Sequence, residues 1–293
     1  MRVHPTALVD PGAWLDSDVV VGPFCIIGPD VRIGKGTRLE ANVHLYPGTT
    51  LGQECRVFAG AKLGGPPQDL KYRGEKSFLI IGDRNIIREE VTIHRATGEG
   101  MATRIGNDNM LMAYCHVGHN CELGSHISMA NQSGISGHVV IEDRVVISGM
   151  VGVHQYVRIG RLAIVGGFSK VVQDIPPFMR ADGRPCEIVG LNVIGLRRAG
   201  MTPNVRSGLK QAYKLIYRSG LNLSQAIETV ESEVDPSEER DYLLSFLNLI
   251  RSGYAGRAND PTGGRIGRHE GRKRDSIDGA EDDTRRDELE EED

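Results

Sequence analysis

The chain has 293 residues, of which 39% are hydrophobic and 25% are charged, and its formal net charge at pH 7 is −4. This balance is typical of a folded globular protein, and we expect neither nucleic acid as a partner nor stable insertion in a membrane. The first residues, MRVHPTALVD, lack the apolar core of a secretory signal, so the predicted location is cytoplasmic. Five cysteines, an odd number, argue against a disulfide framework.

Aliphatic residues recur at every sixth position over most of the chain. The pattern covers residues 9–63, 81–93 and 105–171, which gives ten, three and twelve hexads. A helix repeats every 3.6 residues and a strand every 2, so neither alone explains a strict period of six. A parallel β-helix does explain it, because each hexad can form a short strand and a turn, and three hexads can close one coil. The sequence therefore predicts a mainly β fold in which the aliphatic residues point into a prism.

Two interruptions of the repeat, at about 64–79 and 95–102, predict loops that leave the coil. Loops on a rigid scaffold often carry function. The first loop contains GGPPQDLKYRGE, and its Asp69 and Lys71 are groups of the kind that would grip a sugar hydroxyl and a phosphate. This composition, taken alone, is also that of an ordinary loop.

The stretch CHVGHNC, residues 115–121, holds two cysteines and two histidines. Read alone, it could be a metal site, a nucleophile with its base, or two unrelated structural patterns. The repeat places both cysteines on the small inward position two residues before an aliphatic one, and Cys25 and Cys55 fall on the same position. We therefore predict four buried thiols rather than zinc ligands or nucleophiles.

Histidines recur at about one-coil spacing beside the two interruptions. His116 and His119 fall outside the inward positions, where their side chains are free for chemistry. His138 follows His119 by one coil plus one residue, so the two should lie within about 5–7 Å of each other. His154 comes close to one coil later, and His94 opens the second interruption. A single such histidine is ordinarily a surface residue, but this column indicates a site.

The repeat ends near the pair Pro176 and Pro177, and three amphipathic helical segments follow, at 202–220, 222–234 and 235–253. Beyond them the chain holds 8 Lys/Arg and 13 Asp/Glu with almost no large apolar residues. We therefore expect three regions: a β-helix at 1–186, a small helical domain at 187–253 and a disordered charged tail at 254–293.

The chain resembles the UDP-N-acetylglucosamine O-acyltransferases of lipid A biosynthesis in motifs ordered from Val3 to Gly253: QDLKY, IGDRNIIREEVTIHRAT, CHVGHNC, GHVVIEDRVVISGMVGVHQYVRIG, DIPPF, GLNVIGLRR and AYKLIYRSG. The resemblance implies a left-handed β-helix, whereas the general rule for parallel crossovers predicts a right-handed one. It implies a homotrimer whose active sites lie between two coils. It also implies transfer of a 3-hydroxyacyl group from acyl carrier protein to the 3-hydroxyl of UDP-N-acetylglucosamine, the first step of that pathway, with no cofactor or metal.

The same resemblance suggests roles for individual residues. His119 would be the general base, and the backbone N–H of Gly137 would stabilise the oxyanion. Gly167 falls on the position that measures the acyl chain, and its missing side chain would leave room for a long one. Binding of the sugar, the phosphates and the nucleotide would fall to Gln68, Asp69, Lys71, His116, His138, His154, Gln155, Asn192 and Arg198. The acidic carrier protein could be steered by basic side chains near the groove, namely Arg158, Arg161 and Arg180.

The chain departs from the family pattern at three positions. Asn120 stands where some members have a carboxylate beside the base. Ile194 and Ala199 stand where some members have a Glu and a second Arg at the nucleotide end, which could mean a different nucleotide sugar, such as a 3-amino analogue. Three other interpretations stay open: the N-acyltransferase that acts later in the same pathway, a γ-type carbonic anhydrase-like zinc enzyme, and a non-catalytic trimeric scaffold. The first of these has a different N-terminal domain, which we do not expect here because the hexads of this chain start by Val9.

Overall fold

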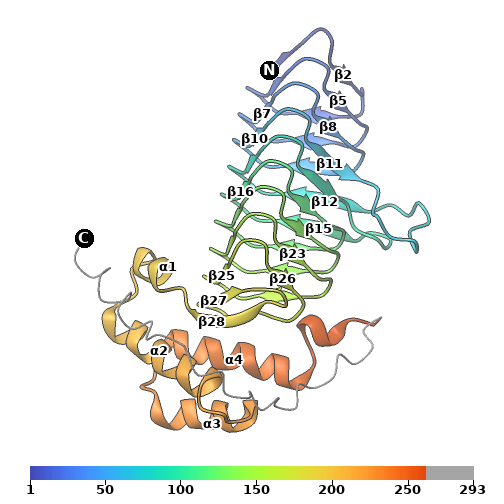
Figure 1. Cartoon of the computed structure of the whole chain (residues 1–293). Helices are drawn as coiled ribbons and strands as arrows, with labels where there is room; N and C mark the ends of the chain where they lie inside the picture. The colour runs from blue at the N-terminus through green and yellow to red at the C-terminus, as the bar shows by residue number, and fades with distance from the viewer. Residues whose placement is uncertain (262–293) are drawn as a thin grey trace. The chain divides into compact units, whose positions relative to one another are not determined.

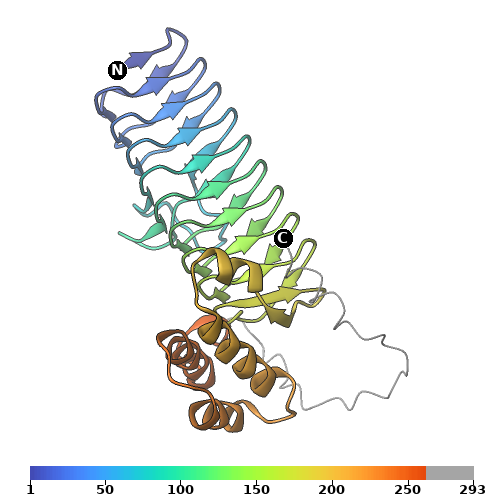
Figure 2. The ribbon, with the colours of Figure 1, turned by 90° about the vertical axis from the view of Figure 1, so that its left-hand side faces the viewer.

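The computed structural model describes residues 1–261, and Figure 1 shows their strands stacked in a column that is followed by helices. Each coil contributes one strand to each of three parallel sheets. Paired residues on neighbouring strands are 18 positions apart, as with Val3 and Val21. Three hexads therefore make one coil, and the predicted parallel β-helix is confirmed. Figure 2 shows the strands from the side, one above another, coil by coil.

The described residues form three sheets of short strands. The first sheet contains β1 (Arg2–Val3), β4 (Val20–Val21), β7 (Arg38–Leu39), β10 (Arg56–Val57), β13 (Ile86–Ile87), β16 (Met110–Leu111), β19 (Ser128–Met129), β22 (Val146–Ile147), β25 (Ile164–Val165), β27 (Met179–Asp182) and β28 (Glu187–Leu191). The second sheet contains β2 (Leu8–Val9), β5 (Ile26–Ile27), β8 (His44–Leu45), β11 (Lys62–Gly65), β14 (Thr92–His94), β17 (His116–Val117), β20 (Gly134–Ile135), β23 (Gly152–Val153) and β26 (Lys170–Val171). The third sheet contains β3 (Trp14–Leu15), β6 (Arg32–Ile33), β9 (Thr49–Leu51), β12 (Phe78–Ile81), β15 (Ala102–Ile105), β18 (Glu122–Leu123), β21 (Val140–Ile141) and β24 (Arg158–Ile159).

The inside of the column is a continuous stack of aliphatic side chains. Ile27, Leu45 and Leu63 are 2%, 0% and 0% exposed, and they lie on the consecutive paired strands β5, β8 and β11. Each inward residue packs on its counterpart in the next coil, so burial of apolar surface stabilises every coil against its neighbours.

Four thiols share this interior. Cys25, Cys55, Cys115 and Cys121 are all 0% exposed, which confirms the prediction that they are buried. The Cys121 thiol donates to the Ser136 carbonyl at 3.0 Å. Burial raises the pKa of Cys115 to about 11 and that of Cys121 to about 12, so neither forms a thiolate near neutral pH.

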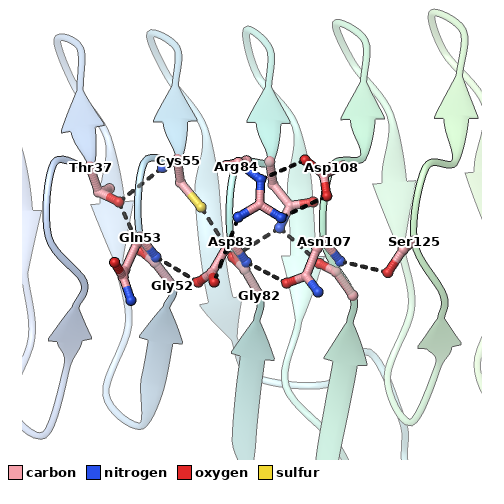
Figure 3. Close-up of polar contacts among 12 residues, drawn as sticks. Thr37, Gly52, Gln53, Cys55, Gly82, Asp83, Arg84, Asn107, Asp108 and Ser125 are labelled. Atoms are coloured by element: carbon pink, nitrogen blue, oxygen red, sulfur yellow. Dashed lines mark hydrogen bonds and ion pairs between the residues drawn. The ribbon is translucent and has the colours of Figure 1, made fainter.

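A ladder of side chains caps the backbone at the corner between the third and first sheets (Figure 3). Asp83 accepts from the N–H of Gln53 at 2.8 Å, and Asn107 accepts from the N–H of Asp83 at 2.7 Å. The hydroxyl of Ser125 continues the ladder, because it accepts from the backbone N–H of Asn107 at 3.0 Å. In this ladder, the backbone N–H at each corner donates to the side chain at the same corner one coil further on.

Two loops leave the coil at the interruptions of the repeat. The first, between β11 and β12, widens the strand register to 30 residues, as between Val57 and Ile87. The second, between β14 and β15, widens it to 24 residues, as between Ile87 and Leu111. The loops bind each other, since the Glu75 carboxylate of the first accepts from the N–H of Gly98 in the second at 3.0 Å. They therefore form one double loop that projects from the side of the column (Figure 1).

The helices after the coil are α1 (Val193–Arg198), α2 (Pro203–Tyr217), α3 (Leu223–Glu233) and α4 (Glu238–Ser252). The side chains of Thr202, Asn222 and Ser237 cap the starts of the last three. Gly253 ends α4 with φ of 71°, a left-handed conformation that glycine adopts at little cost. None of the helices within residues 1–261 is both long and apolar enough to cross a bilayer.

Two of the arginines proposed to steer the carrier protein, Arg158 and Arg161, lie between the coil and α4. Arg158 forms an ion pair with Glu142 at 3.1 Å, and its guanidinium lies 4.4 Å from the centre of the Phe246 ring. Arg161 lies 4.0 Å from the centre of the Tyr242 ring. These contacts place both side chains between the coil and α4, and their steering of a carrier protein stays a prediction.

The expected domain boundaries also need correction. β28 pairs antiparallel with β27, so residues 187–191 still belong to a sheet and the helices begin only at Val193. Residues 254–261, expected in the disordered tail, include the 3₁₀ helix η1 (Gly256–Asn259). This segment is held because the N–H of Arg257 donates to Asp174 of the coil at 3.0 Å. The rest of the expected tail, 262–293, lies outside the described residues.

Candidate active site

A groove with a volume of about 550 Å³ runs along the outer face of the second sheet. Its floor is made by the first residues of four paired strands, which are His116, Gly134, Gly152 and Lys170. The two glycines meet no other atom within 4 Å of an added Cβ, so the middle of the floor is open. The groove could hold an extended chain between its polar ends.

His119 stands at one edge of this groove, at the corner that follows β17. Its Nδ1 lies 2.8 Å from Oδ1 of Asn120. Asn120 is fixed in turn by Thr97 of the second loop, which donates its N–H to Oδ1 at 2.9 Å and accepts from Nδ2 at 3.0 Å. An amide oxygen only accepts, so the neutral imidazole carries its proton on Nδ1 and presents an unprotonated Nε2. The arrangement provides a proton acceptor.

The backbone of Gly137 lies against this imidazole. A Cβ at Gly137 would come 2.7 Å from Nε2 of His119, so only glycine fits without displacing the ring. Within residues 1–261 the N–H of Gly137 donates to no acceptor. The side chain one coil further on is Gln155, whose Nε2 donates to Asp260 at 3.1 and 3.0 Å. A proton acceptor and an available N–H donor therefore lie side by side.

A column of rings continues from the base along the same corner. The rings of His119 and His138 meet edge to face with centroids 5.2 Å apart, which confirms their predicted proximity. His138 stacks in parallel on Tyr156 at 4.5 Å. Sequence reasoning missed Tyr156, although its spacing of 18 residues from His138 places it on the same corner one coil later. Burial, followed by the neighbouring His119, lowers the pKa of His138.

Two more imidazoles line the groove on the other side of His119. His116 Nδ1 lies 2.8 Å from the Thr92 hydroxyl, and the His94 ring meets the His116 ring edge to face at 5.0 Å. Burial, then His116 and His119, lowers the pKa of His94 to about 4. Burial and His119 also lower the pKa of His116. These rings are therefore uncharged at neutral pH and offer hydrogen bonds rather than charge.

The first loop brings polar groups to the same place within one chain. Gln68 lines the groove, and the Asp69 carboxylate accepts from the N–H of Lys71 at 2.9 Å. That bond, with a contribution from the nearby His119, lowers the pKa of Asp69. Lys71 is exposed on the same loop. His154 and Gln155 line the groove at its other end.

Three predicted residues lie away from the groove of the single chain. Asn192 is 7% exposed, and its side chain caps α1 and donates to the Leu162 carbonyl at 2.8 Å, while its contact with the nucleotide stays a prediction. Arg198 ends α1, is exposed and forms no ion pair with any residue in the described part of the chain. Gly167 lies at the corner before β26, across the second sheet from His119.

The fold and the groove define a hexapeptide-repeat transferase. The family model of bacterial transferase hexapeptides, six repeats, matches residues 102–137. The model of UDP-N-acetylglucosamine O-acyltransferase, domain 2, matches residues 174–255. The first match covers coils of the β-helix, and the second covers the end of the coil and helices α1 to α4.

Curated relatives and solved structures extend the likeness over most of the chain. The acyl-(acyl-carrier-protein)--UDP-N-acetylglucosamine O-acyltransferase of Thermodesulfovibrio yellowstonii is 45% identical over 254 residues, which are 86% of this chain and 98% of the relative. That of Anaeromyxobacter dehalogenans is 46% identical over 254 residues, or 86% and 99% of the two chains. The structure of LpxA from Acinetobacter baumannii matches with a TM-score of 0.82 and 42% identity, over 85% of this chain and 97% of that one. This chain belongs to the UDP-N-acetylglucosamine O-acyltransferase family, which confirms the expected left-handed β-helix.

Proposed function

We propose that this chain transfers a 3-hydroxyacyl group from acyl carrier protein to the 3-hydroxyl of UDP-N-acetylglucosamine, as the first step of lipid A biosynthesis. One observation carries the proposal: His119, fixed through Nδ1 by Asn120, presents Nε2 beside the N–H of Gly137 in an open groove. The relatives of this family, named for the same reaction, support it.

The chemistry follows from these two groups. A sugar hydroxyl is a weak nucleophile until a base takes its proton, and His119 Nε2 does so as the oxygen attacks the thioester carbonyl. Negative charge then develops on the carbonyl oxygen, and the Gly137 N–H donates to it. The intermediate collapses with loss of the carrier thiolate, which takes the proton back from the imidazolium. An ester has formed, a thioester has broken, and the base is regenerated.

The remaining groove residues are proposed to hold the nucleotide sugar. Asp69 accepts hydrogen bonds from sugar hydroxyls, Gln68 and Lys71 contact the phosphates, and the imidazoles of the column form hydrogen bonds with the sugar. The residues proposed to complete this contact are His116, His138, His154 and Gln155. His116, His154 and Gln155 line the same groove as Gln68, and the His138 ring packs against that of His119, which supports the assignment.

We also propose a homotrimer, in which α1 of one chain completes the groove of another. Arg198, exposed and without an ion pair within residues 1–261, is then available for the phosphates of a neighbouring site. At that neighbouring site, Asn192 would contact the nucleotide only with atoms that are not used in capping α1 or in binding the Leu162 carbonyl. The cytoplasmic location remains a prediction.

Gly167 is proposed to set the acyl length. An added Cβ there would meet Gly149 O at 3.5 Å and Ser148 Cβ at 3.9 Å, which are ordinary contacts. Packing therefore does not demand glycine at this corner, and a functional reason fits better. A long hydroxyacyl chain is the expected donor.

A different nucleotide sugar is the second candidate substrate. Ile194, 46% exposed on α1, and Ala199 stand where a carboxylate and a guanidinium would otherwise contact the nucleotide end. Their loss removes charge from that end and leaves a 3-amino analogue open as acceptor. Family membership favours acyl transfer over the carbonic anhydrase-like and scaffold interpretations.

The test is mass spectrometry of the products that the purified chain forms from a panel of 3-hydroxyacyl carrier proteins with UDP-N-acetylglucosamine or its 3-amino analogue. We expect a monoacylated ester of UDP-N-acetylglucosamine, formed fastest from a long donor. An amide product formed only from the analogue would favour the second substrate, and no acylated product from either sugar would refute acyl transfer.

A further inference from the structure

The segment after α4 returns to the coil and brings a buried carboxylate to the end of the groove. Asp260 is 8% exposed, and its two carboxylate oxygens accept from Nε2 of Gln155 at 3.1 and 3.0 Å. Arg257 pairs with the same carboxylate. Gln155 lines the groove, so Asp260 stands directly behind a side chain proposed to contact the substrate.

The placement of Asp260 is built into the segment. The N–H of Arg257 donates to Asp174 at 3.0 Å, and the same carboxylate accepts from the N–H of Arg158 at 2.7 Å. Gly256 has φ of 76°, and a Cβ there would lie 2.0 Å from Oδ2 of Asp174. Only glycine allows so close an approach in this conformation. The 3₁₀ helix η1 is thus fastened to the coil and directs Asp260 toward Gln155.

The charge of Asp260 also reaches the ring column. Burial first, and Asp260 second, raises the pKa of Tyr156. Asp260 opposes the burial that lowers the pKa of His138. The carboxylate is therefore close to the two stacked rings as well as to Gln155.

This residue lies outside the segment that the family model matches. That model ends at residue 255. Gln155 lies inside the coil, whereas the group that holds it comes from beyond residue 255.

We propose that Asp260 is a positioning residue of this enzyme, which fixes the Gln155 side chain in the conformation that binds the nucleotide sugar. The identity of that ligand rests on the proposed function. A bond from an amide N–H to a carboxylate is charge-assisted and stronger than a neutral one. A side chain that is already ordered loses less conformational entropy when the ligand binds, so its contribution to affinity is larger.

The test replaces Asp260 in the full chain and measures binding and kinetics separately. Calorimetry gives the affinity for UDP-N-acetylglucosamine, and steady-state assays give KM for each substrate. We expect Asp260→Ala to weaken nucleotide-sugar binding and raise its KM by roughly fivefold to tenfold, while kcat and the KM for the acyl carrier protein change less than about twofold. Asp260→Glu should recover part of the loss. Asp235→Ala, which removes an exposed carboxylate before α4, is the matched control and should change neither quantity.

A double-variant cycle separates positioning from a general structural role. Gln155→Ala should weaken the same binding, and adding Asp260→Ala to it should cause little further loss, because the interaction is already absent. An unchanged KM in Asp260→Ala, or fully additive losses in the double variant, would overturn the proposal. If Asp260→Ala unfolds, Asp260→Asn keeps the shape with a neutral acceptor, and an unchanged nucleotide-sugar affinity in that variant would count equally against it.

Failure of the proposed function gives a different result. The wild-type chain would then form no acylated sugar, whatever stands at position 260. Failure of the Asp260 proposal instead leaves wild-type transfer intact and the nucleotide-sugar KM of the variants unmoved.

Discussion

Nδ1 of His119 and Oδ1 of Asn120 lie 2.8 Å apart, and Asn120 is held in turn by two hydrogen bonds to the backbone of Thr97. The amide therefore sets the tautomer and the direction of the imidazole, a task that a carboxylate at this position could also perform. The neutral amide of Asn120 orients the imidazole without placing a negative charge beside the groove. The second loop, which carries Thr97, thus contributes to the orientation of the base.

Replacing Asn120 should impair catalysis more than folding. Asn120→Ala frees the imidazole to rotate and to change tautomer, and we expect kcat to fall by about 10-fold to 100-fold, less than the loss expected when the base itself is removed. Asn42→Ala is the matched control, because Asn42 is an exposed corner asparagine with the same φ of 57°. Steady-state kinetics and melting temperatures of both variants make the comparison. Wild-type kcat in Asn120→Ala would show that the hydrogen bond does not orient the base.

Gly137→Ala should inactivate without unfolding. The new methyl group would lie 2.7 Å from Nε2 of His119 and push the imidazole out of place, so we expect kcat to fall by at least about 100-fold. Gly190→Ala serves as the control, because an added Cβ at Gly190 meets nothing within 4 Å. Transfer assays with circular dichroism distinguish lost activity from lost structure. An active Gly137→Ala variant would contradict the close pairing of this backbone with the base.

The half-buried imidazole of His94 should make the protein sensitive to acid. An unfolded histidine has a pKa of about 6.5, whereas burial lowers that of His94 to about 4 in the folded chain. Between these values the unfolded state binds a proton that the folded state does not, so stability falls as pH falls from about 6.5 through 4. In His94→Gln the side chain no longer titrates, but it still fills much of the space of the imidazole. In the wild type, Nδ1 of His94 is buried and has no hydrogen-bond partner among residues 1–261.

The loss of melting temperature between pH 7.5 and pH 5 should therefore be smaller in His94→Gln than in the wild type. His4→Gln, at an exposed position, should behave like the wild type. An equal acid-induced loss in all three proteins would show that His94 does not titrate as its burial requires.

The period of six predicted the coil because inward residues must stack at every turn, and the same period placed the four thiols inside. It also predicted the contact of His119 with His138, since one coil plus one residue brings two corner residues together. It could not predict the role of Asp260, because that contact joins residues 105 positions apart through a segment without any repeat. The capping role of Asn192 was also hidden, since a motif match does not reveal which local backbone groups a side chain binds.

The most direct test of the central claim is the single-turnover rate of acyl transfer to UDP-N-acetylglucosamine in His119→Gln compared with the wild type. Glutamine keeps much of the size and polarity of the imidazole but cannot accept the hydroxyl proton. The account predicts a rate at least about 100-fold lower, with the affinity for the nucleotide sugar changed less than about threefold. A variant that transfers the acyl group at the wild-type rate would contradict it.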